Sequence, residues 1–135
     1  MRFVDTNILL YSLDLEPAEP RKGEIARGIL LSADLVLSVQ VLQEFYVQAT
    51  RASRPDALPH DIAGLLIQKW LRFRVQENSV AVLQAALDIR QRFVVSYWDA
   101  NIIAAARIAR CSEILSEDLN AGQDYDGVKV VNPFA

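Results

Sequence analysis

The residues that build several common catalytic sites are scarce in this sequence. One cysteine and one histidine occur among 135 residues, so no internal disulfide and no zinc site of clustered cysteine and histidine can form. A Ser-His-Asp triad would have to use His60, whose place beside Pro59 predicts a helix start instead. We expect Cys111 to be a small buried apolar residue. A lone cysteine also fits a reducing cytoplasm, where we expect the protein to act.

Long apolar runs and an excess of positive charge are also absent. No run approaches the roughly 20 residues of a membrane-spanning helix, and no signal-peptide pattern opens the chain, so we expect no membrane partner. Neither of the phosphate-loop patterns GxxxxGK[ST] and GxGxxG occurs. The net charge of −3 argues against general electrostatic attraction to nucleic acid, although a basic patch or a bound metal can still bind it.

Short apolar runs alternate with segments of helical periodicity along the whole chain. The expected strands are 2–4, 35–38, 74–76, 113–116 and 128–131; the expected helices are 6–13, 21–32, 40–52, 61–73, 79–93 and 98–110, with a loop over 15–20. This alternation predicts a single α/β domain over residues 1–135, in which helices cover both faces of a parallel sheet.

Four acidic residues accompany the predicted strands. Asp5 follows the first strand and Asp118 follows the fourth, while Glu44 and Asp99 lie early in helices next to strands. Because ligands of open α/β sheets bind outside the carboxyl ends of the strands, we expect these side chains near one edge. Converging carboxylates repel one another and would suit Mg²⁺ or Mn²⁺, which can activate water for phosphodiester hydrolysis.

Each acid also has a structural explanation. Glu44 lies opposite an apolar stripe and would be solvated on that account. Asp99 would favour the start of a helix capped by Ser96, and Asp118 belongs to a turn-like stretch. Asp5 is the hardest to explain in this way, because a charge at the end of a central strand is costly unless it is paired, hydrogen-bonded or bound to metal.

Asp5-Thr6-Asn7 after the first strand, Glu44 in LQEFY, Asp99 in YWDANIIAAA and Asp118 in LSEDLNAGQDYDG together resemble a PIN-domain ribonuclease, in particular the VapC kind of toxin from toxin–antitoxin pairs. The resemblance reaches the terminal VKVVNPF. It implies a three-layer α/β/α fold around a parallel sheet of about five strands, and Mg²⁺- or Mn²⁺-dependent endonucleolytic cleavage of RNA by metal-activated water. It also implies a homodimer and an antitoxin whose tail occupies the acidic groove.

The resemblance also assigns roles to single residues. It implies that the four acids are the catalytic metal ligands and that three small polar residues, Thr6, Asn7 and Ser116, support them. For the fourth acid we choose Asp118, two residues after Ser116, over its neighbours. Glu117 should face the opposite way, Asp124 is nearby in sequence, and Asp126-Gly127 resembles a turn into the last strand.

Candidate contacts with RNA are less specific. Arg51 and Arg54 follow the Glu44 helix, and a second basic cluster comprises Lys69, Arg72 and Arg74; ordinary solvated residues are the alternative for each. We expect Trp98 to pack in the core rather than to stack on bases.

Two other functions remain open at the level of sequence. A phosphatase with Asp5 as nucleophile would need a second aspartate two residues later, where Asn7 stands. A non-catalytic PIN-like module that binds RNA or protein would have no need of four acids.

Overall fold

The computed structural model describes residues 1–14 and 19–135 and contains the predicted elements, with ends displaced by less than one helical turn. The strands are β1 (Arg2–Val4), β2 (Leu35–Ser38), β3 (Arg74–Gln76), β4 (Glu113–Leu115), β5 (Asp124–Tyr125) and β6 (Val128–Val131). The helices are α1 (Thr6–Ser12), α2 (Pro20–Ile29), α3 (Val39–Ala49), α4 (His60–Trp70), α5 (Val80–Arg92) and α6 (Tyr97–Ile108). Of the loop expected at 15–20, Pro20 is instead the first residue of α2, and 15–18 lie outside the described residues.

The six strands form one sheet in the order β3-β2-β1-β4-β6-β5. All pairings are parallel except that of β5 with β6, which is antiparallel. No sequence pattern predicted β5, but the turn expected at Asp126-Gly127 is present and joins it to β6. Both turn residues have positive φ, 55° at Asp126 and 96° at Gly127, as tight hairpin turns require. The central strands β1 and β4 lie side by side, so residues 5 and 116 emerge together at their carboxyl ends.

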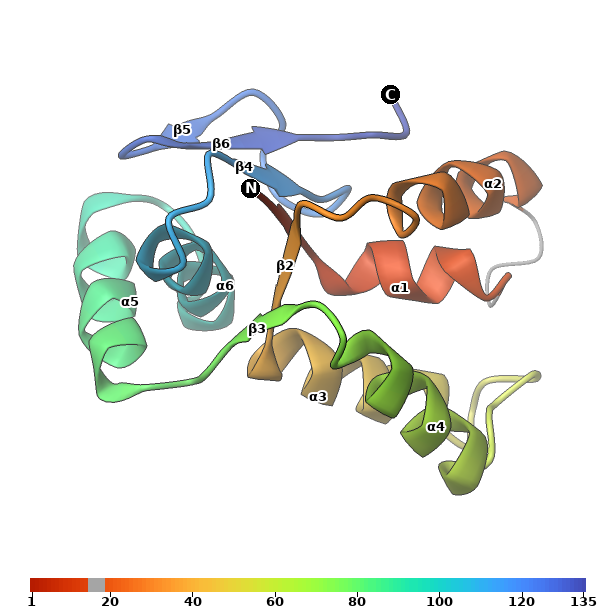
Figure 1. The fold of residues 1–135 in the computed structure, drawn as a ribbon. Helices are drawn as coiled ribbons and strands as arrows, with labels where there is room; N and C mark the ends of the chain where they lie inside the picture. The colour runs from red at the N-terminus through yellow and green to blue at the C-terminus, as the bar shows by residue number, and fades with distance from the viewer. Residues whose placement is uncertain (15–18) are drawn as a thin grey trace.

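Helices lie on both sides of the sheet, as expected (Figure 1). Figure 1 shows α5 and α6 on one side and α1 and α2 on the other, with α3 and α4 packed together where β2 ends. Apolar side chains from β1, β2 and β4 are fully buried between these layers, among them Phe3, Val36 and Ile114. Within the described part of the chain, no helix is long and apolar enough to cross a membrane.

Two single residues test the expectations about the core. Cys111 is buried and reduced, as predicted. Trp98, which we expected in the core, is 61% exposed, so that prediction is wrong. The physical reason is its place in the first turn of α6: the helix is buried from Ala100 to Ala106, whereas Trp98 lies before this stretch and lines a surface groove.

Candidate active site

Asp5 stands between β1 and α1 and is only 7% exposed. It is the N-cap of α1, because its Oδ1 accepts a hydrogen bond of 2.7 Å from the backbone N–H of Thr6. Its Oδ2 accepts a second bond of 2.7 Å from the hydroxyl of Ser116, which follows β4. The parallel pairing of β1 with β4 therefore fixes the carboxylate at the carboxyl edge of the sheet.

The surroundings of Asp5 disfavour its charged form. Burial raises the pKa of Asp5 from its ordinary value of 3.8 to about 6, and the two hydrogen bonds offset only part of that effect. The negative charges of Glu44 and Asp118 raise the pKa further. An acid with this titration is unusual in the middle of a fold, and it is one sign of a functional site.

Glu44 is half-buried and held by residues from two helices. The Thr6 hydroxyl donates to its Oε2 at 2.8 Å, and the Gln40 side-chain amide donates to its Oε1 at 2.8 Å. Gln40 itself accepts a bond of 2.6 Å from Asn101 on α6 and donates to the Trp98 carbonyl. Glu44 is thus fixed next to α1 and α6 rather than lying on a freely solvated face of α3.

Asp118 is held by Asn7 and Ser116. The Asn7 amide donates to Asp118 Oδ2 at 3.2 Å, and the Ser116 hydroxyl oxygen accepts from the backbone N–H of Asp118 at 3.1 Å and of Leu119 at 3.3 Å. Ser116 is fully buried and contacts Asp5 as well. One serine therefore connects the acid after β1 to the acid after β4.

Asp99 lies in the first turn of α6 and is exposed. Ser96 caps the helix as predicted, since its hydroxyl oxygen accepts from the Asp99 N–H at 3.1 Å. Partial burial raises the pKa of Asp99, the Ser96 hydroxyl lowers it, and Glu44 and Asp118 raise it again. Asp99 and Asp118 also line one surface hollow with Tyr125.

The four predicted acids are therefore neighbours, although they do not form a finished metal site. Among residues 1–14 and 19–135, no three acidic, histidine or cysteine side chains have an arrangement that could hold a metal ion. The charges that act on Asp5 and Asp99 are nevertheless those of other acids. Carboxylate oxygens that repel one another suit a hard divalent cation.

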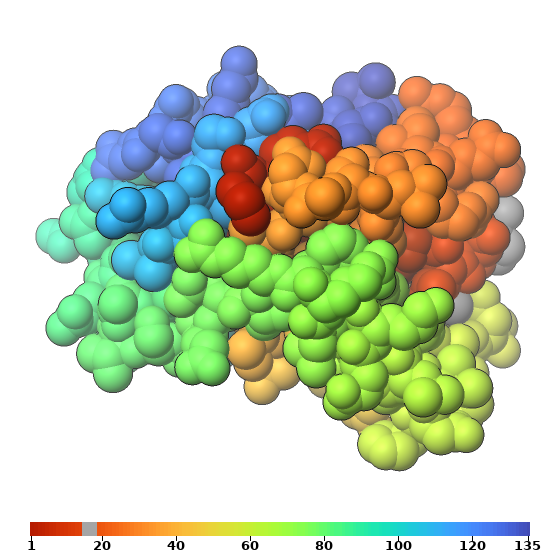
Figure 2. Space-filling model, in the orientation of Figure 1, coloured from red at the N-terminus to blue at the C-terminus, as the bar shows by residue number. Residues whose placement is uncertain are grey.

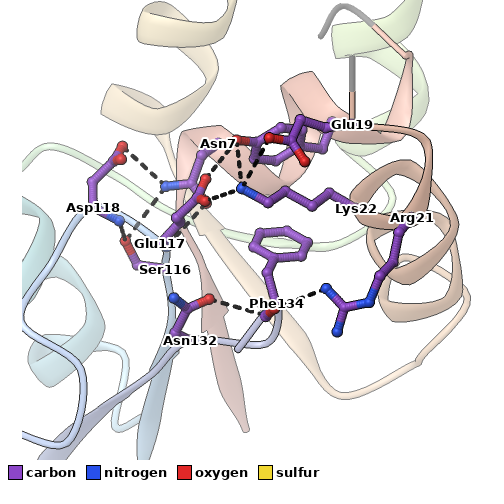
Figure 3. Close-up of polar contacts among 10 residues, drawn as sticks. Asn7, Glu19, Arg21, Lys22, Ser116, Glu117, Asp118, Asn132 and Phe134 are labelled. Atoms are coloured by element: carbon purple, nitrogen blue, oxygen red, sulfur yellow. Dashed lines mark hydrogen bonds and ion pairs between the residues drawn. The ribbon is translucent and has the colours of Figure 1, made fainter. Parts of the chain in front are cut away.

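Glu117 points away from this group, as its position next to Asp118 predicted. Figure 3 shows its carboxylate beside the Lys22 ammonium of α2, with which it forms an ion pair; it also accepts a bond of 2.6 Å from the Tyr11 hydroxyl. Lys22 lies over the rings of Tyr11 and Phe134, at 5.1 and 5.8 Å from their centres. This cluster fastens the 116–118 turn to α1 and α2. Lys22 could not be predicted from the sequence, because nothing local links it to Glu117, 95 positions away.

The other two acids near the C-terminus have turn roles. Asp124 Oδ1 accepts from the Gly127 N–H at 2.6 Å, and Asp126 pairs with Arg92 and lies 3.6 Å from Arg107. The contacts with these arginines lower the pKa of Asp126. Both acids thus stabilise the β5–β6 hairpin.

The predicted basic residues differ in their distance from the acids. Arg51 lines a groove that also contains Glu44. Arg54 donates to the Gln48 carbonyl at 3.2 Å and so helps to close the end of α3.

The second basic cluster lies at the opposite edge of the sheet. Arg74 begins β3 and donates to the Ala109 carbonyl, while Arg72 donates to the carbonyls of Lys69 and Leu30. Figure 2 shows this edge, with the start of the chain in red between the orange segment before β2 and the blue segment before β4. The expectation that this cluster contacts phosphates near the acids is wrong, because the acids lie at the carboxyl ends of the strands.

Comparison with families of known proteins matches residues 2–123 to the PIN domain model. The chain belongs to the PIN domain family. The resemblance seen in the four acidic motifs is thereby confirmed, and so is the α/β fold around a mostly parallel sheet. Comparison with curated proteins gives no significant match.

Solved structures share the PIN fold at low sequence identity. A toxin–antitoxin complex from Klebsiella pneumoniae has a TM-score of 0.70 at 21% identity, with 98% of each chain covered. VapC20 of Mycobacterium tuberculosis, described as a toxin that cleaves the Sarcin-Ricin loop, has a TM-score of 0.67 at 20% identity, covering 87% of this chain and 92% of its own. DNA-bound VapBC from Salmonella typhimurium has a TM-score of 0.66 at 16% identity, covering 96% of this chain and 95% of its own.

Proposed function

We propose that this PIN domain protein is an endoribonuclease that hydrolyses RNA phosphodiester bonds with Mg²⁺ or Mn²⁺, and that it is the toxin of a toxin–antitoxin pair. The observation that carries the proposal is the group of four acids near the carboxyl edge of the sheet. Neighbouring acids raise the pKa values of Asp5 and Asp99. Residues next to Asp5 hold the other two acids, since Thr6 donates to Glu44 and Asn7 donates to Asp118. Nothing in a purely structural role explains why Asp5 should be buried with two other negative charges close enough to raise its pKa.

In this proposal, Asp5, Glu44, Asp99 and Asp118 hold the cation. When bound, the cation would neutralise phosphate charge and lower the pKa of a water molecule. The polar residues of the motifs keep the acids in place: Thr6 fixes Glu44, Asn7 fixes Asp118, and Ser116 fixes Asp5. At Asp5 the Ser116 hydroxyl and the Thr6 N–H offset part of the effect of burial on the pKa, because a hydrogen bond donated to a carboxylate favours its charged form.

The proposed partners come from the solved structures that share the fold. The similar structures include toxins in complex with antitoxins, so we propose a cognate antitoxin for this chain and RNA as the substrate. A small DNA-binding protein encoded beside the gene should bind this chain and stop its activity. A homodimer stays a prediction, which sedimentation of the purified protein would test.

The direct test is cleavage of RNA by the purified protein. We expect cleavage with Mg²⁺ or Mn²⁺, its loss in EDTA and its loss in Asp5→Asn. Asp56→Asn is the matched control, because Asp56 is an exposed aspartate between α3 and α4. Growth arrest on induction should depend on Asp5 in the same way. Cleavage that persists in EDTA would refute the metal role, and tight RNA binding without cleavage under any divalent cation would favour the non-catalytic module.

A further inference from the structure

A groove of about 630 Å³ runs along the face of α3 from Gln40 to Arg51, with Trp98 of α6 as its other wall. Glu44 lies in the same groove, so one of the four acids belongs both to the candidate active site and to this surface. Any chain bound along the groove would therefore pass directly beside the acids. Whatever occupies it is well placed to be part of the substrate.

Trp98 gives the groove a flat apolar surface. Its side chain is 61% exposed and packs edge-on against the ring of Tyr97, with ring centres 5.1 Å apart. The Gln40 amide that fixes Glu44 also donates to the Trp98 carbonyl at 3.2 Å. The backbone of Trp98 and the carboxylate of Glu44 are thus held by one side chain, so the indole is attached at a defined point beside the acids.

Val47 adds a second exposed apolar side chain to the groove, and the other lining residues are polar, with a positive charge at the far end. Side-chain amides of Gln43 and Gln48 lie along α3, and the exposed guanidinium of Arg51 follows just beyond its last turn. At about 1.5 Å of rise per residue, Arg51 lies roughly 10 Å along the helix from Glu44. An aromatic plane, amides that can bond to base edges and a guanidinium for phosphate are the groups with which proteins bind unpaired nucleotides.

We propose that this groove binds a single-stranded stretch of the RNA substrate, with an unpaired base stacked on Trp98 and a phosphate at Arg51. The inference rests on the proposed ribonuclease function, since a cation at the acids must offset the charge of Glu44 for RNA to lie beside it. A polyanion suits Arg51 and the amides, whereas an apolar helix of a partner protein would leave them without water or hydrogen bonds. A base inside a duplex cannot offer its face to the indole, so the groove selects unpaired RNA.

The test uses the full wild-type chain, which keeps all four acids, in Mg²⁺ with a short unstructured RNA oligonucleotide whose phosphorothioate linkages resist hydrolysis and with a duplex of the same sequence. The single strand should bind more tightly than the duplex. Trp98→Ala should weaken single-strand binding by about 5- to 100-fold, the range measured for removing one base–aromatic stack, and Trp98→Phe should restore most of it. Arg51→Ala should weaken binding and make the slope of log affinity against log salt concentration shallower by about one, as for the loss of one phosphate contact.

Two control variants keep the comparison specific. Leu87→Ala and Arg90→Ala remove an exposed apolar and an exposed basic side chain from α5, outside the groove, and should leave RNA affinity unchanged. The chain has two tryptophans, and only Trp98 is exposed, because Trp70 is buried. A base stacked on Trp98 should therefore quench tryptophan fluorescence when RNA is added. This quenching should be absent in Trp98→Phe. Equal affinity for single strand and duplex, or full affinity in Trp98→Ala, would overturn the proposal. So would a Trp98→Ala variant that loses only self-association or antitoxin binding.

Failure of the groove and failure of the ribonuclease give different results. If the wild-type protein cleaves RNA and Trp98→Ala cleaves it with the same KM, the groove is refuted and the ribonuclease stands. If the wild-type protein cleaves no RNA but the single strand binds in a way that needs Trp98, the ribonuclease is refuted and the groove stands. If no RNA binds at all, both are refuted.

Discussion

Replacing Asp5 by asparagine should stabilise the metal-free protein while it abolishes activity. The buried carboxylate has a pKa of about 6 in the folded chain and an ordinary value of 3.8 when exposed. Between those values the folded state binds more protons than the unfolded state, so stability falls as pH rises through this range. At roughly 1.4 kcal/mol per pH unit, the ionised carboxylate costs about 3 kcal/mol above pH 6, and nothing below pH 3.8.

Part of this gain is offset by lost hydrogen bonding. Ser116 Oγ already accepts from the N–H groups of Asp118 and Leu119, so it has little capacity left for the amide N–H of an asparagine at position 5. An unsatisfied donor of this kind costs about 1 kcal/mol or somewhat more. We therefore expect a net stabilisation of about 2 kcal/mol at pH 7.5, which for a chain of this length raises Tm by about 5–7 °C.

The assay is thermal or urea denaturation in EDTA at a series of pH values from 4 to 8. The free energy of unfolding of Asp5→Asn minus that of the wild type should rise by about 2.5 kcal/mol from pH 4 and level off above about pH 6.5. High salt should change the difference little, because burial contributes more than the neighbouring charges. Asp56→Asn should show no such trend. Parallel stability curves for wild type and Asp5→Asn, or an Asp5→Asn variant less stable at pH 7.5, would refute this account of Asp5.

Four further outcomes follow from the same structure. Mg²⁺ or Mn²⁺ at millimolar concentration should raise the Tm of the wild type but not of Asp5→Asn, and an equal rise in both would place the cation elsewhere. Thr6→Val should lower kcat about 10- to 100-fold by freeing Glu44, with less than about 1 kcal/mol lost in urea unfolding; an unchanged kcat would contradict it. Phe45→Ala should cost about 3–5 kcal/mol, because Phe45 is fully buried; a loss under about 2 kcal/mol in urea would be unexpected. Gly127→Ala should lower the free energy of unfolding by about 1 kcal/mol, because φ is 96° at this turn residue, whereas Gly28→Ala on α2 should be neutral or stabilising. Equal changes of Tm in the two variants would contradict the role given to Gly127 in the turn.

Most of the fold could be predicted because the strands are short apolar runs bounded by polar residues. The runs at 35–38 and 74–76 are strands with the predicted bounds. β5 could not be predicted, since Asp124-Tyr125 is too short to show any alternation and forms only because the turn after it pairs it with β6. Helix ends were overextended where apolar residues continue past the last helical turn, as at Leu71 and Phe73 after α4.

The candidate site was predictable where it depends on strand ends and not where it depends on packing between distant segments. Asp5 and Asp118 follow strands that the pattern identifies, so their shared edge follows from parallel pairing. Gln40 is different: it lies one helical turn before Glu44, for which the apolar stripe on the opposite side predicted a solvated face, yet Gln40 is buried between α3 and α6. A polar residue four positions before an acid and a second one, Asn101, inside an alanine-rich helix were the only signals available.

The same packing explains why the candidate site lowers the stability of the metal-free protein. Ser116 and Asn7 connect the carboxylates after β1 and β4 through bonds of 2.7 and 3.2 Å, so neither acid can move away from the other to relieve repulsion. Lys22 fixes the turn between them from outside by its pair with Glu117. A fold that only needed stability would place apolar or neutral residues here, as the expected gain in Asp5→Asn implies. The charge is retained at the expense of stability, and a bound cation is the simplest means of recovering that loss.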